Sequence, residues 1–309
     1  LRDFLSPSLL GKTFDDAADV VQAMARVRGH EMAKAAVEAA IWDVLARKRG
    51  VPLASLLGGT QQDIPCGVSL GIHPEVSGLL DQIARELSAG YQRIKLKIKP
   101  GKDVAVVAAV RKEYPGIALT VDANSAYTLK DAALLKQLDE FDLTYIEQPL
   151  EWNEIYQHAE LQRQLNTPIC LDECIHTLRD VQAAIQLGAC KVINIKLGRV
   201  SGHSEARKIQ QYCLEHEIPV WCGGMLESGI GRAHNIAMSS LPGFVLPGDI
   251  SASKRYWRRD VIVPDVQVSA CGTIRVPTAA GIGFVVDKQF IEEITTRREL
   301  WRKNAAVSS

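Results

Sequence analysis

The sequence predicts an α/β protein built on a (β/α) barrel, with a helical segment in front of the barrel. From about residue 64, short β-rich segments alternate with helical segments, which is typical of βα units around a parallel sheet. Charged residues also recur at the predicted strand ends, with steps of 25, 25, 25 and 24 residues between Lys97, Asp122, Glu147, Asp172 and Lys196. One step is the length of one βα unit, so these side chains are expected to meet at one mouth of the barrel.

Helices are predicted between residues 13 and 48. Apolar residues recur there at helical spacing, for example Ala33, Ala36, Val37, Ala40 and Ile41. Gly50 and Pro52 are typical of the end of a helix. The region is therefore expected to form a helical lead-in to the barrel.

Seven strands are predicted after the lead-in, each followed by a helical stretch: 66–70, 93–99, 118–121, 144–147, 168–172, 191–196 and 219–222. A weaker eighth candidate at 244–246 approaches the count of a closed barrel. A doubly wound open sheet is the structural rival, but the first βα turn lacks G-x-G-x-x-G and no G-x-x-x-x-G-K-[ST] occurs. Nucleotide binding therefore has little support. After the barrel, a last helix is predicted at 287–301, and this tail is expected to pack back on the lead-in.

Composition excludes several classes of protein. Lys+Arg and Asp+Glu both count 36, so no net charge favours nucleic acid or an anionic membrane as a partner. The seven cysteines are odd in number and form no C-x-x-C pair, which indicates reduced thiols in a cytoplasm. The sequence has neither a charged-then-apolar leader nor an apolar run of roughly 18 residues, so we expect an unexported protein without a membrane span. It begins at Leu1 without a Met, so its N-terminus is expected to be incomplete.

Asp122, Glu147 and Asp172 are predicted to bind a metal ion. Each interrupts or closes an apolar run, where a charge without a partner is unfavourable. A single such Asp would more often be a helix N-cap or an ion-pair partner. Three carboxylates in the same step repel one another unless they share a cation, and an all-oxygen set suits a hard ion such as Mg²⁺.

Lys95 and Lys97 are expected to point into the barrel. Side chains alternate along a strand, so Ile94, Leu96 and Ile98 face the other way, although an ordinary half-exposed strand has the same alternation. Crowded cations and reduced solvation both lower the pKa of a lysine, as a neutral amine base at pH 7 requires. The lysine that ends the sixth predicted strand is expected to face the same pocket from across the barrel.

A rival nucleophile motif lies between the first strand and its helix, where residues 67–71 match G-x-S-x-G. In α/β-hydrolases several strands precede this motif, whereas here the preceding stretch is mainly helical. A hydrolase would also leave the three carboxylates unexplained. A polar contact between Ser69 and substrate is the plainer role.

Five motifs at the strand ends resemble the muconate lactonizing subgroup of the enolase superfamily: Lys95-Leu96-Lys97, Val121-Asp122-Ala123-Asn124, Ile146-Glu147-Gln148-Pro149-Leu150, Leu171-Asp172-Glu173 and Asn194-Ile195-Lys196. Within this subgroup, residues 223–231 and 247–253 resemble the o-succinylbenzoate synthase and N-acylamino acid racemase family. The resemblance covers nearly the whole chain.

The resemblance implies a (β/α)7β TIM-like barrel with a partial, N-terminally truncated capping domain built from both chain ends. Residues 1–60 would be the helical remainder of the capping domain, residues 61–260 the barrel, and residues 261–309 a C-terminal segment that packs back on the capping region. Family members begin with a small sheet whose mobile loop closes over the substrate, and nothing before Leu1 supplies it. A truncated, inactive barrel is therefore the non-enzymatic alternative.

The resemblance also implies a reaction. Enolase-superfamily sites use a Lys or His base with one or two Mg²⁺ ions, and Mn²⁺ is an alternative ion. A small-molecule carboxylate would lose its α-proton to give an enediolate. In the synthase, which acts by dehydration in menaquinone biosynthesis, Lys97 would take the proton and protonate the departing hydroxyl while Lys196 stabilises the enediolate. In the racemase, the two lysines would act on opposite faces of the substrate.

Further roles follow from the same resemblance. Lys95 would contact the carboxylate and lower the pKa of Lys97. Asn124 and Glu173 would support the metal ligands from behind. Substrate contacts are expected from Ser69, Gly223, Met225 and Ser251.

Several alternatives stay open. The synthase and the racemase use the same lysines and metal, so the sequence does not choose between them. A mandelate-racemase-like enzyme would carry a His base where this chain has only Lys196. Dipeptide epimerases are closer, but their D-x-D pattern is missing at residues 248–251. A homo-oligomer is expected, although no local motif specifies it.

Overall fold

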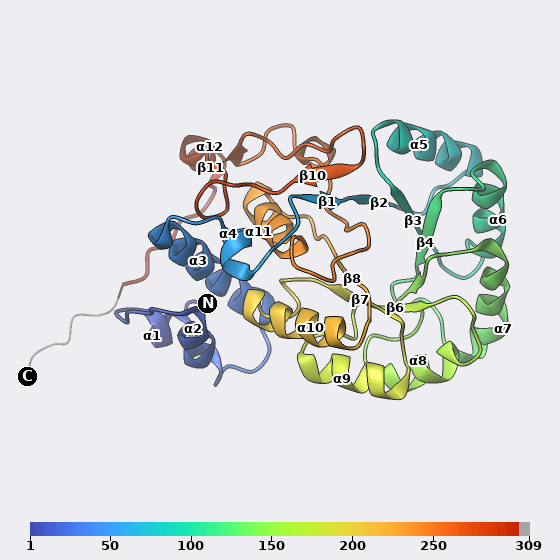
Figure 1. Ribbon diagram of the computed structural model, residues 1–309, viewed down its shortest axis with the longest axis horizontal. Coiled ribbons are helices and arrows are strands. Elements are labelled where there is room, and N and C mark those ends of the chain that lie inside the picture. Colours follow the sequence, from blue (N-terminus) through green and yellow to red (C-terminus); the bar gives the residue numbers. More distant parts are fainter. Residues whose placement is uncertain (303–309) are drawn as a thin grey trace, which may run out of the picture.

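A seven-stranded parallel sheet curls around the barrel region (Figure 1) in the computed structural model, which describes residues 1–302 of the 309-residue chain. The strands follow chain order and each pairs in parallel with the next: β2 (Gly67–Leu70), β3 (Arg93–Lys97), β4 (Ala118–Asp122), β5 (Ile146–Glu147), β6 (Ile169–Leu171), β7 (Val192–Ile195) and β8 (Val220–Cys222). All seven predicted strands are confirmed; six are shorter than predicted, and β4 extends one residue further, to Asp122.

Residues 244–248 lie where the eighth strand of the barrel was expected, but they do not form a regular strand. Phe244 makes a parallel bridge to β8, and Gly248 makes one to the residue before β2. The prediction of a strand at 244–246 is therefore wrong, although the segment lies where that strand was expected. Pro247 has no backbone N–H to donate, which interrupts a regular ladder.

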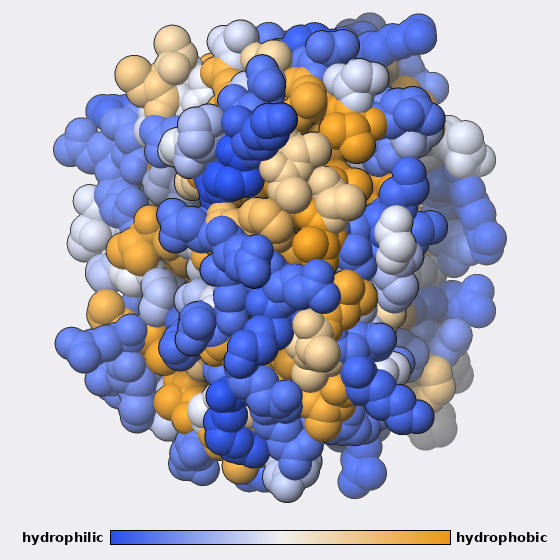
Figure 2. All heavy atoms as spheres, turned by 90° about the vertical axis from the view of Figure 1, so that its right-hand side faces the viewer, coloured by the Kyte–Doolittle hydropathy of each residue, from blue (hydrophilic) through white to orange (hydrophobic). Residues whose placement is uncertain are grey.

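Helices cover the outside of the sheet (Figure 1). They follow the strands in turn: α5 (Val76–Ser88), α6 (Val104–Glu113), α7 (Ala132–Leu135) between the short helices η1 (Leu129–Asp131) and η2 (Lys136–Phe141), α8 (Ile155–Gln162), α9 (Leu178–Leu187), α10 (His203–Glu215) and α11 (Gly229–Ser239). In α5, Leu79 and Ile83 are buried four residues apart, so one stripe of the helix is apolar. Over α5 to α7, hydrophilic side chains cover much of the surface and apolar side chains gather in a band between them (Figure 2).

The predicted helical lead-in is confirmed. It contains four helices: α1 (Ser6–Leu9), α2 (Ala17–Met24), α3 (Glu31–Arg49) and α4 (Leu53–Leu57). Helix α3 ends at Gly50, whose φ of 68° lies in the left-handed region that glycine adopts without a steric penalty. Glu38 of α3 is fully buried and accepts hydrogen bonds from the backbone N–H groups of His203 (2.6 Å) and Ser204 (2.8 Å). The lead-in therefore caps the first turn of α10.

The C-terminal segment takes part in two small antiparallel strand pairs. Its elements, in chain order, are η3 (Ser253–Arg255), β9 (Ile262–Val263), β10 (Thr273–Arg275), β11 (Val285–Val286) and α12 (Lys288–Ile294). Strand β10 pairs with β1 (Asp63–Pro65), and β11 pairs with β9. Gly281 accepts a hydrogen bond from the backbone of Leu53 (2.7 Å), so this segment contacts the lead-in. The helix predicted at 287–301 is too long, because α12 ends before Thr295, whose backbone is extended. Residues 303–309 of the predicted segment 261–309 lie outside the described residues.

Two expectations from composition can be compared with the structure. All seven cysteines are unpaired, and every one except Cys271 is buried. None of the helices within residues 1–302 is both long and apolar enough to cross a membrane.

Candidate active site

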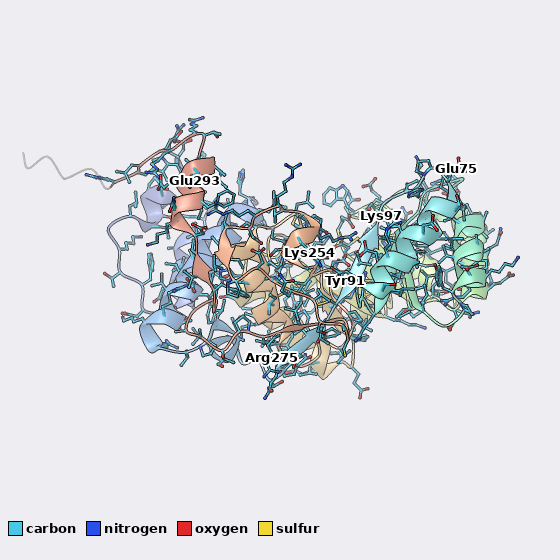
Figure 3. The ribbon with its side chains drawn as sticks, turned by 90° about the horizontal axis from the view of Figure 1, so that it is seen from above. Glu75, Tyr91, Lys97, Lys254, Arg275 and Glu293 are labelled. Carbon is cyan, nitrogen blue, oxygen red and sulfur yellow. The ribbon has the colours of Figure 1, made fainter. Side chains whose placement is uncertain are left out.

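The five charged residues with the constant step lie at the C-terminal ends of consecutive barrel strands. Lys97, Asp122 and Glu147 are paired in register across β3, β4 and β5. Asp172 directly follows β6, and Lys196 directly follows β7. Lys97 lies towards the upper edge in Figure 3, whereas Arg275 lies at the opposite, lower edge. The predicted convergence at one mouth is therefore found.

The two faces of β3 differ as predicted. Ile94 and Leu96 belong to the main hydrophobic core. Lys95 and Lys97 instead make ion pairs with the carboxylates that end β5 and β4, respectively. The period of two along the strand therefore separates the apolar and the charged side chains.

Each of the three carboxylates accepts a hydrogen bond from a lysine. The Lys97 Nζ lies 2.6 Å from Asp122 Oδ2, and the Lys95 Nζ lies 2.7 Å from Glu147 Oε2. In the same way, Lys196 Nζ donates to Asp172 Oδ2 at 2.7 Å. These carboxylates are at most 2% exposed, so their charges need such partners.

Asp249 is a carboxylate of the site that sequence reasoning did not assign. Its Oδ2 lies 2.6 Å from Lys95 Nζ, and its Oδ1 lies 2.7 Å from an Arg93 amino nitrogen. Both cations also lie over the ring of Trp221, with Lys95 Nζ 4.7 Å from the ring centroid. Asp249 lies within residues 247–253, one of the two stretches that carried the family resemblance. That resemblance was the signal that could have assigned Asp249 to the site.

Two further polar residues were also missed. Asn194 Nδ2 donates to Glu147 Oε1 at 2.9 Å, and Arg199 donates to a carboxylate oxygen and to the backbone carbonyl of Asp172, the latter at 2.8 Å. Asn194 precedes Lys196 by two residues on β7, so the period of two could have identified it. No comparable signal marks Arg199, which lies in the loop after the strand.

The pKa values of two carboxylates move in opposite directions. Burial and the neighbouring Asp122 carboxylate raise the pKa of Glu147 to about 8. Burial would also raise the pKa of Asp172, but the Lys196 ammonium and the Arg199 guanidinium outweigh it and lower this pKa to about 2. Negative charge is therefore poorly compensated at Glu147 and well compensated at Asp172.

Despite burial, nearby carboxylates raise the pKa values of two lysines, and for Lys95 this contradicts the lowering expected of the crowded lysines on β3. Burial opposes the charged form of Lys95, but nearby carboxylates, Asp249 first among them, raise its pKa well above the usual value. Burial likewise opposes the charge on Lys196, and the Asp172 carboxylate raises the pKa in spite of it. The expectation of a lowered lysine pKa took account of the crowded cations and of burial. It did not take account of how closely the carboxylates approach the lysine ammonium groups.

The three carboxylates fit Mg²⁺ in donor type. All their side-chain donors are oxygens, which hard divalent ions prefer, and burial together with the like charge of Asp122 raises the pKa of Glu147. Within residues 1–302, however, no group of three His, Cys, Asp or Glu side chains is arranged around a common metal position. Each carboxylate pairs with a lysine instead. Their role as metal ligands therefore stays a prediction.

Asn124 and Glu173 lie beside the predicted ligands. Asn124 accepts a hydrogen bond from Lys97 and donates through Nδ2 to Glu173 Oε1 at 3.0 Å. The backbone N–H of Asn124 also donates to Asp122 Oδ1 at 3.0 Å. Burial raises the pKa of Glu173, and the Asp172 carboxylate adds to this effect. The two residues thus connect the ends of β4 and β6.

The four predicted substrate contacts are spread around the mouth. Gly223 is next to Lys196, because a Cβ at this glycine would lie 2.6 Å from Lys196 Cε. Met225 is 40% exposed, and its backbone N–H donates hydrogen bonds to the carboxylate of Glu227 in the same loop. Ser251 is buried and its carbonyl accepts a hydrogen bond from Arg232 at 2.9 Å, and within residues 1–302 this bond does not involve the charged cluster.

Ser69 is half-buried on β2, in register with Lys95 of β3. Its carbonyl accepts a hydrogen bond from Arg255 at 3.1 Å. Among residues 1–302, none of the hydrogen bonds joins its hydroxyl to a histidine. The serine-hydrolase interpretation therefore has no base and gains no support.

Comparisons with known proteins cover both parts of the chain. Residues 1–58 match the N-terminal domain of mandelate racemase / muconate lactonizing enzyme, and residues 78–290 match the enolase C-terminal domain-like family. The o-succinylbenzoate synthase of Geobacillus kaustophilus is 51% identical over 307 residues, 99% of this chain and 82% of the relative. The N-succinylamino acid racemase of an Amycolatopsis species is 48% identical over 299 residues, 96% and 81% of the two chains.

A solved structure agrees with these sequence matches. An enolase-superfamily protein from Enterococcus faecalis V583 superimposes with a TM-score of 0.89 at 45% identity, covering 94% of this chain and 79% of the other. Matches of this extent, together with the charged residues at the barrel strand ends, establish the relationship. The chain is therefore an enzyme of the enolase superfamily and belongs to the mandelate racemase / muconate lactonizing enzyme family.

Proposed function

We propose that this enzyme is a Mg²⁺-dependent o-succinylbenzoate synthase. The placement of Lys97 and Lys196 is the observation that carries the proposal. Lys97 ends β3 and Lys196 directly follows β7, and the three carboxylates at the intervening strand ends lie between them. Two lysine amino groups on either side of a carboxylate cluster suit a reaction at the carbon next to a substrate carboxylate. The 51% identity to a synthase over nearly the whole chain supports the same reaction.

The proposed mechanism divides the work between the two lysines. When bound to Asp122, Glu147 and Asp172, Mg²⁺ would neutralise the negative charge that develops on the substrate carboxylate. Lys97 Nζ, in its neutral form, takes the α-proton, and the electron pair moves into the carboxylate to give an enediolate. Lys196 remains an ammonium group and stabilises that charge. The Lys97 proton then passes to the departing hydroxyl, so water leaves and the double bond forms.

Racemisation of an N-succinylamino acid is the second candidate. The 48% identity to such a racemase favours it, and the same two lysines could serve it. One lysine removes the α-proton from one face, and the other returns a proton to the opposite face. A dipeptide epimerase is less favoured, because Gly248-Asp249-Ile250-Ser251 does not contain the D-x-D pattern.

The decisive experiment measures turnover of the purified protein on two substrates, the o-succinylbenzoate precursor and an N-succinylamino acid. Each is assayed with Mg²⁺, with Mn²⁺ and with EDTA. We expect activity on both, higher with the precursor, and loss of both activities in EDTA. Activity that survives EDTA would overturn the metal-dependent mechanism. A clear preference for the amino acid would make the racemase the main function.

The cellular setting is part of the proposal. The unpaired cysteines support a reducing cytoplasm, and a role in menaquinone biosynthesis would follow from the synthase activity. A homo-oligomer is proposed as well, and light scattering on the purified protein tests it by measuring the mass against the 33.9 kDa of one chain.

A further inference from the structure

Gln148 occupies an unusual position directly after Glu147. Its side chain is fully buried. Its φ of 38° lies in the left-handed region, which residues with a Cβ rarely adopt. Such a conformation persists where the surroundings hold it firmly, and it is more common near functional sites.

The main-chain groups of Gln148 join two neighbouring strand ends. Its N–H donates to the carbonyl of Cys170 in β6 at 2.9 Å. Its carbonyl accepts from the N–H of Ser125, in the loop after β4, at 2.9 Å. One residue therefore contacts the strand ends on both sides of its own.

The side chain of Gln148 reaches further into the loop after β6. Oε1 accepts hydrogen bonds from the backbone N–H groups of Asp172 (3.0 Å) and Cys174 (3.3 Å). Nε2 donates to the carbonyl of Leu150, in the loop after β5, at 3.1 Å. The hydrogen-bonding groups of this buried amide are thus engaged within the ring of strand ends.

We propose that Gln148 is the positioning residue that sets the spacing of the three predicted metal ligands. The proposal rests on the proposed function, which assigns Asp122, Glu147 and Asp172 to the metal. The carbonyl of Gln148 accepts a hydrogen bond from the loop after Asp122, and its side chain accepts one from the N–H of Asp172. Gln148 is also adjacent in sequence to Glu147. The three ligands come from three separate strands, so their relative positions depend on contacts between the strand ends.

The physical reason is the narrow geometry that Mg²⁺ requires. This ion demands near-ideal octahedral coordination at about 2.0–2.1 Å, so a small displacement of one ligand weakens binding. Residues that orient ligands without touching the metal typically change its affinity by about 10- to 100-fold when they are altered. Gln148 contacts the backbone of one ligand and adjoins another, so its loss should act on the affinity more than on folding.

Gln162 provides a matched control at the other end of β6. It is also a buried glutamine whose Oε1 accepts from a backbone N–H, that of Ile169, at 2.7 Å. Its Nε2 donates to the carbonyl of Thr167 at 3.1 Å. Its hydrogen bonds are of the same kind, but they lie at the N-terminal end of the strand, away from the carboxylates.

The test measures Mg²⁺ affinity by titration calorimetry for the full chain and for Gln148→Met, Gln148→Asn and Gln162→Met. Asparagine tolerates a positive φ but is one methylene too short to reach the Asp172 N–H, so Gln148→Asn serves if Gln148→Met does not fold. We expect both Gln148 variants to bind Mg²⁺ at least about tenfold more weakly. Gln162→Met should lose thermal stability and keep the wild-type affinity.

Two failures can be distinguished. If the unaltered protein binds Mg²⁺ and the Gln148 variants bind it equally well, the positioning role is overturned and the proposed function stands. The positioning role is also overturned if Gln162→Met weakens binding as much as Gln148→Met. If the unaltered protein does not bind Mg²⁺, the proposed function fails and takes this inference with it.

Discussion

The two faces of strand β3 follow different physical rules. Towards the helices, Ile94 and Leu96 are buried in the main hydrophobic core, where any well-filled apolar contact is favourable. Towards the barrel interior, Arg93, Lys95 and Lys97 carry charges, and each has a carboxylate partner. The outer layer supplies non-directional stability. The inner face holds charged groups whose interactions depend on distance and direction.

This difference separates stability from function. Burying an ion costs free energy that its partner only partly returns, so charged pairs inside the barrel are weak evidence for stability. Chemistry at the mouth of the barrel is a better explanation for charged side chains in this position. Substitutions on the inner face should therefore remove activity, while substitutions on the outer face should remove stability.

The largest effect is expected for the inner-face lysines. Lys97→Ala and Lys196→Ala should each lower turnover by roughly 100- to 10,000-fold, the usual contribution of a general acid or base. Circular dichroism should show that both variants remain folded. Substantial turnover by either variant in the synthase assay would refute the two-lysine assignment.

A change on the outer face of the same strand should have the opposite result. Leu96 is 2% exposed, and Leu96→Ala should lower the free energy of unfolding by about 2–5 kcal/mol through lost burial and a cavity. Urea denaturation measures this loss. The folded fraction should bind Mg²⁺ as the unaltered protein does, and a large loss of affinity would show that the two faces are not independent.

The smallest effect concerns a titratable group in the outer layer. Burial lowers the pKa of His158 on α8 to about 4, and its Nε2 accepts from the N–H of Leu150 at 3.1 Å. The unfolded chain takes up this proton near pH 6.5 and the folded chain only near pH 4. The neutral imidazole therefore stabilises the fold fully above about pH 6.5, and this contribution falls away as the pH drops to about 4.

His158→Gln measures that contribution, because glutamine keeps an acceptor for the Leu150 N–H. Between pH 6.5 and pH 4, the unaltered protein should lose up to about 3 kcal/mol more stability than the variant. Urea denaturation at several pH values gives both curves. Parallel curves would mean that His158 does not account for any of the acid sensitivity.

Much of the fold and part of the site could be predicted from residue patterns. Alternating segments located all seven strands, and the step of 25 residues brought Lys97, Asp122 and Glu147 to one mouth. The prediction of an eighth strand was wrong, because Phe244 and Gly248 form isolated bridges rather than a ladder. Arg199 escaped notice because loop residues carry no periodicity that would indicate where they point.

What the sequence determined by itself was which chemical groups stand at which end of the barrel. Side chains alternate with a period of two and βα units repeat with a nearly constant length, and both rules act along the chain. Only the tertiary structure decided the partners: Asp249 beside Lys95, and Gln148 between three strand ends. It also decided that the pKa of Lys95 rises, because the balance of burial against opposite charge depends on distances of a few ångströms between residues far apart in the chain.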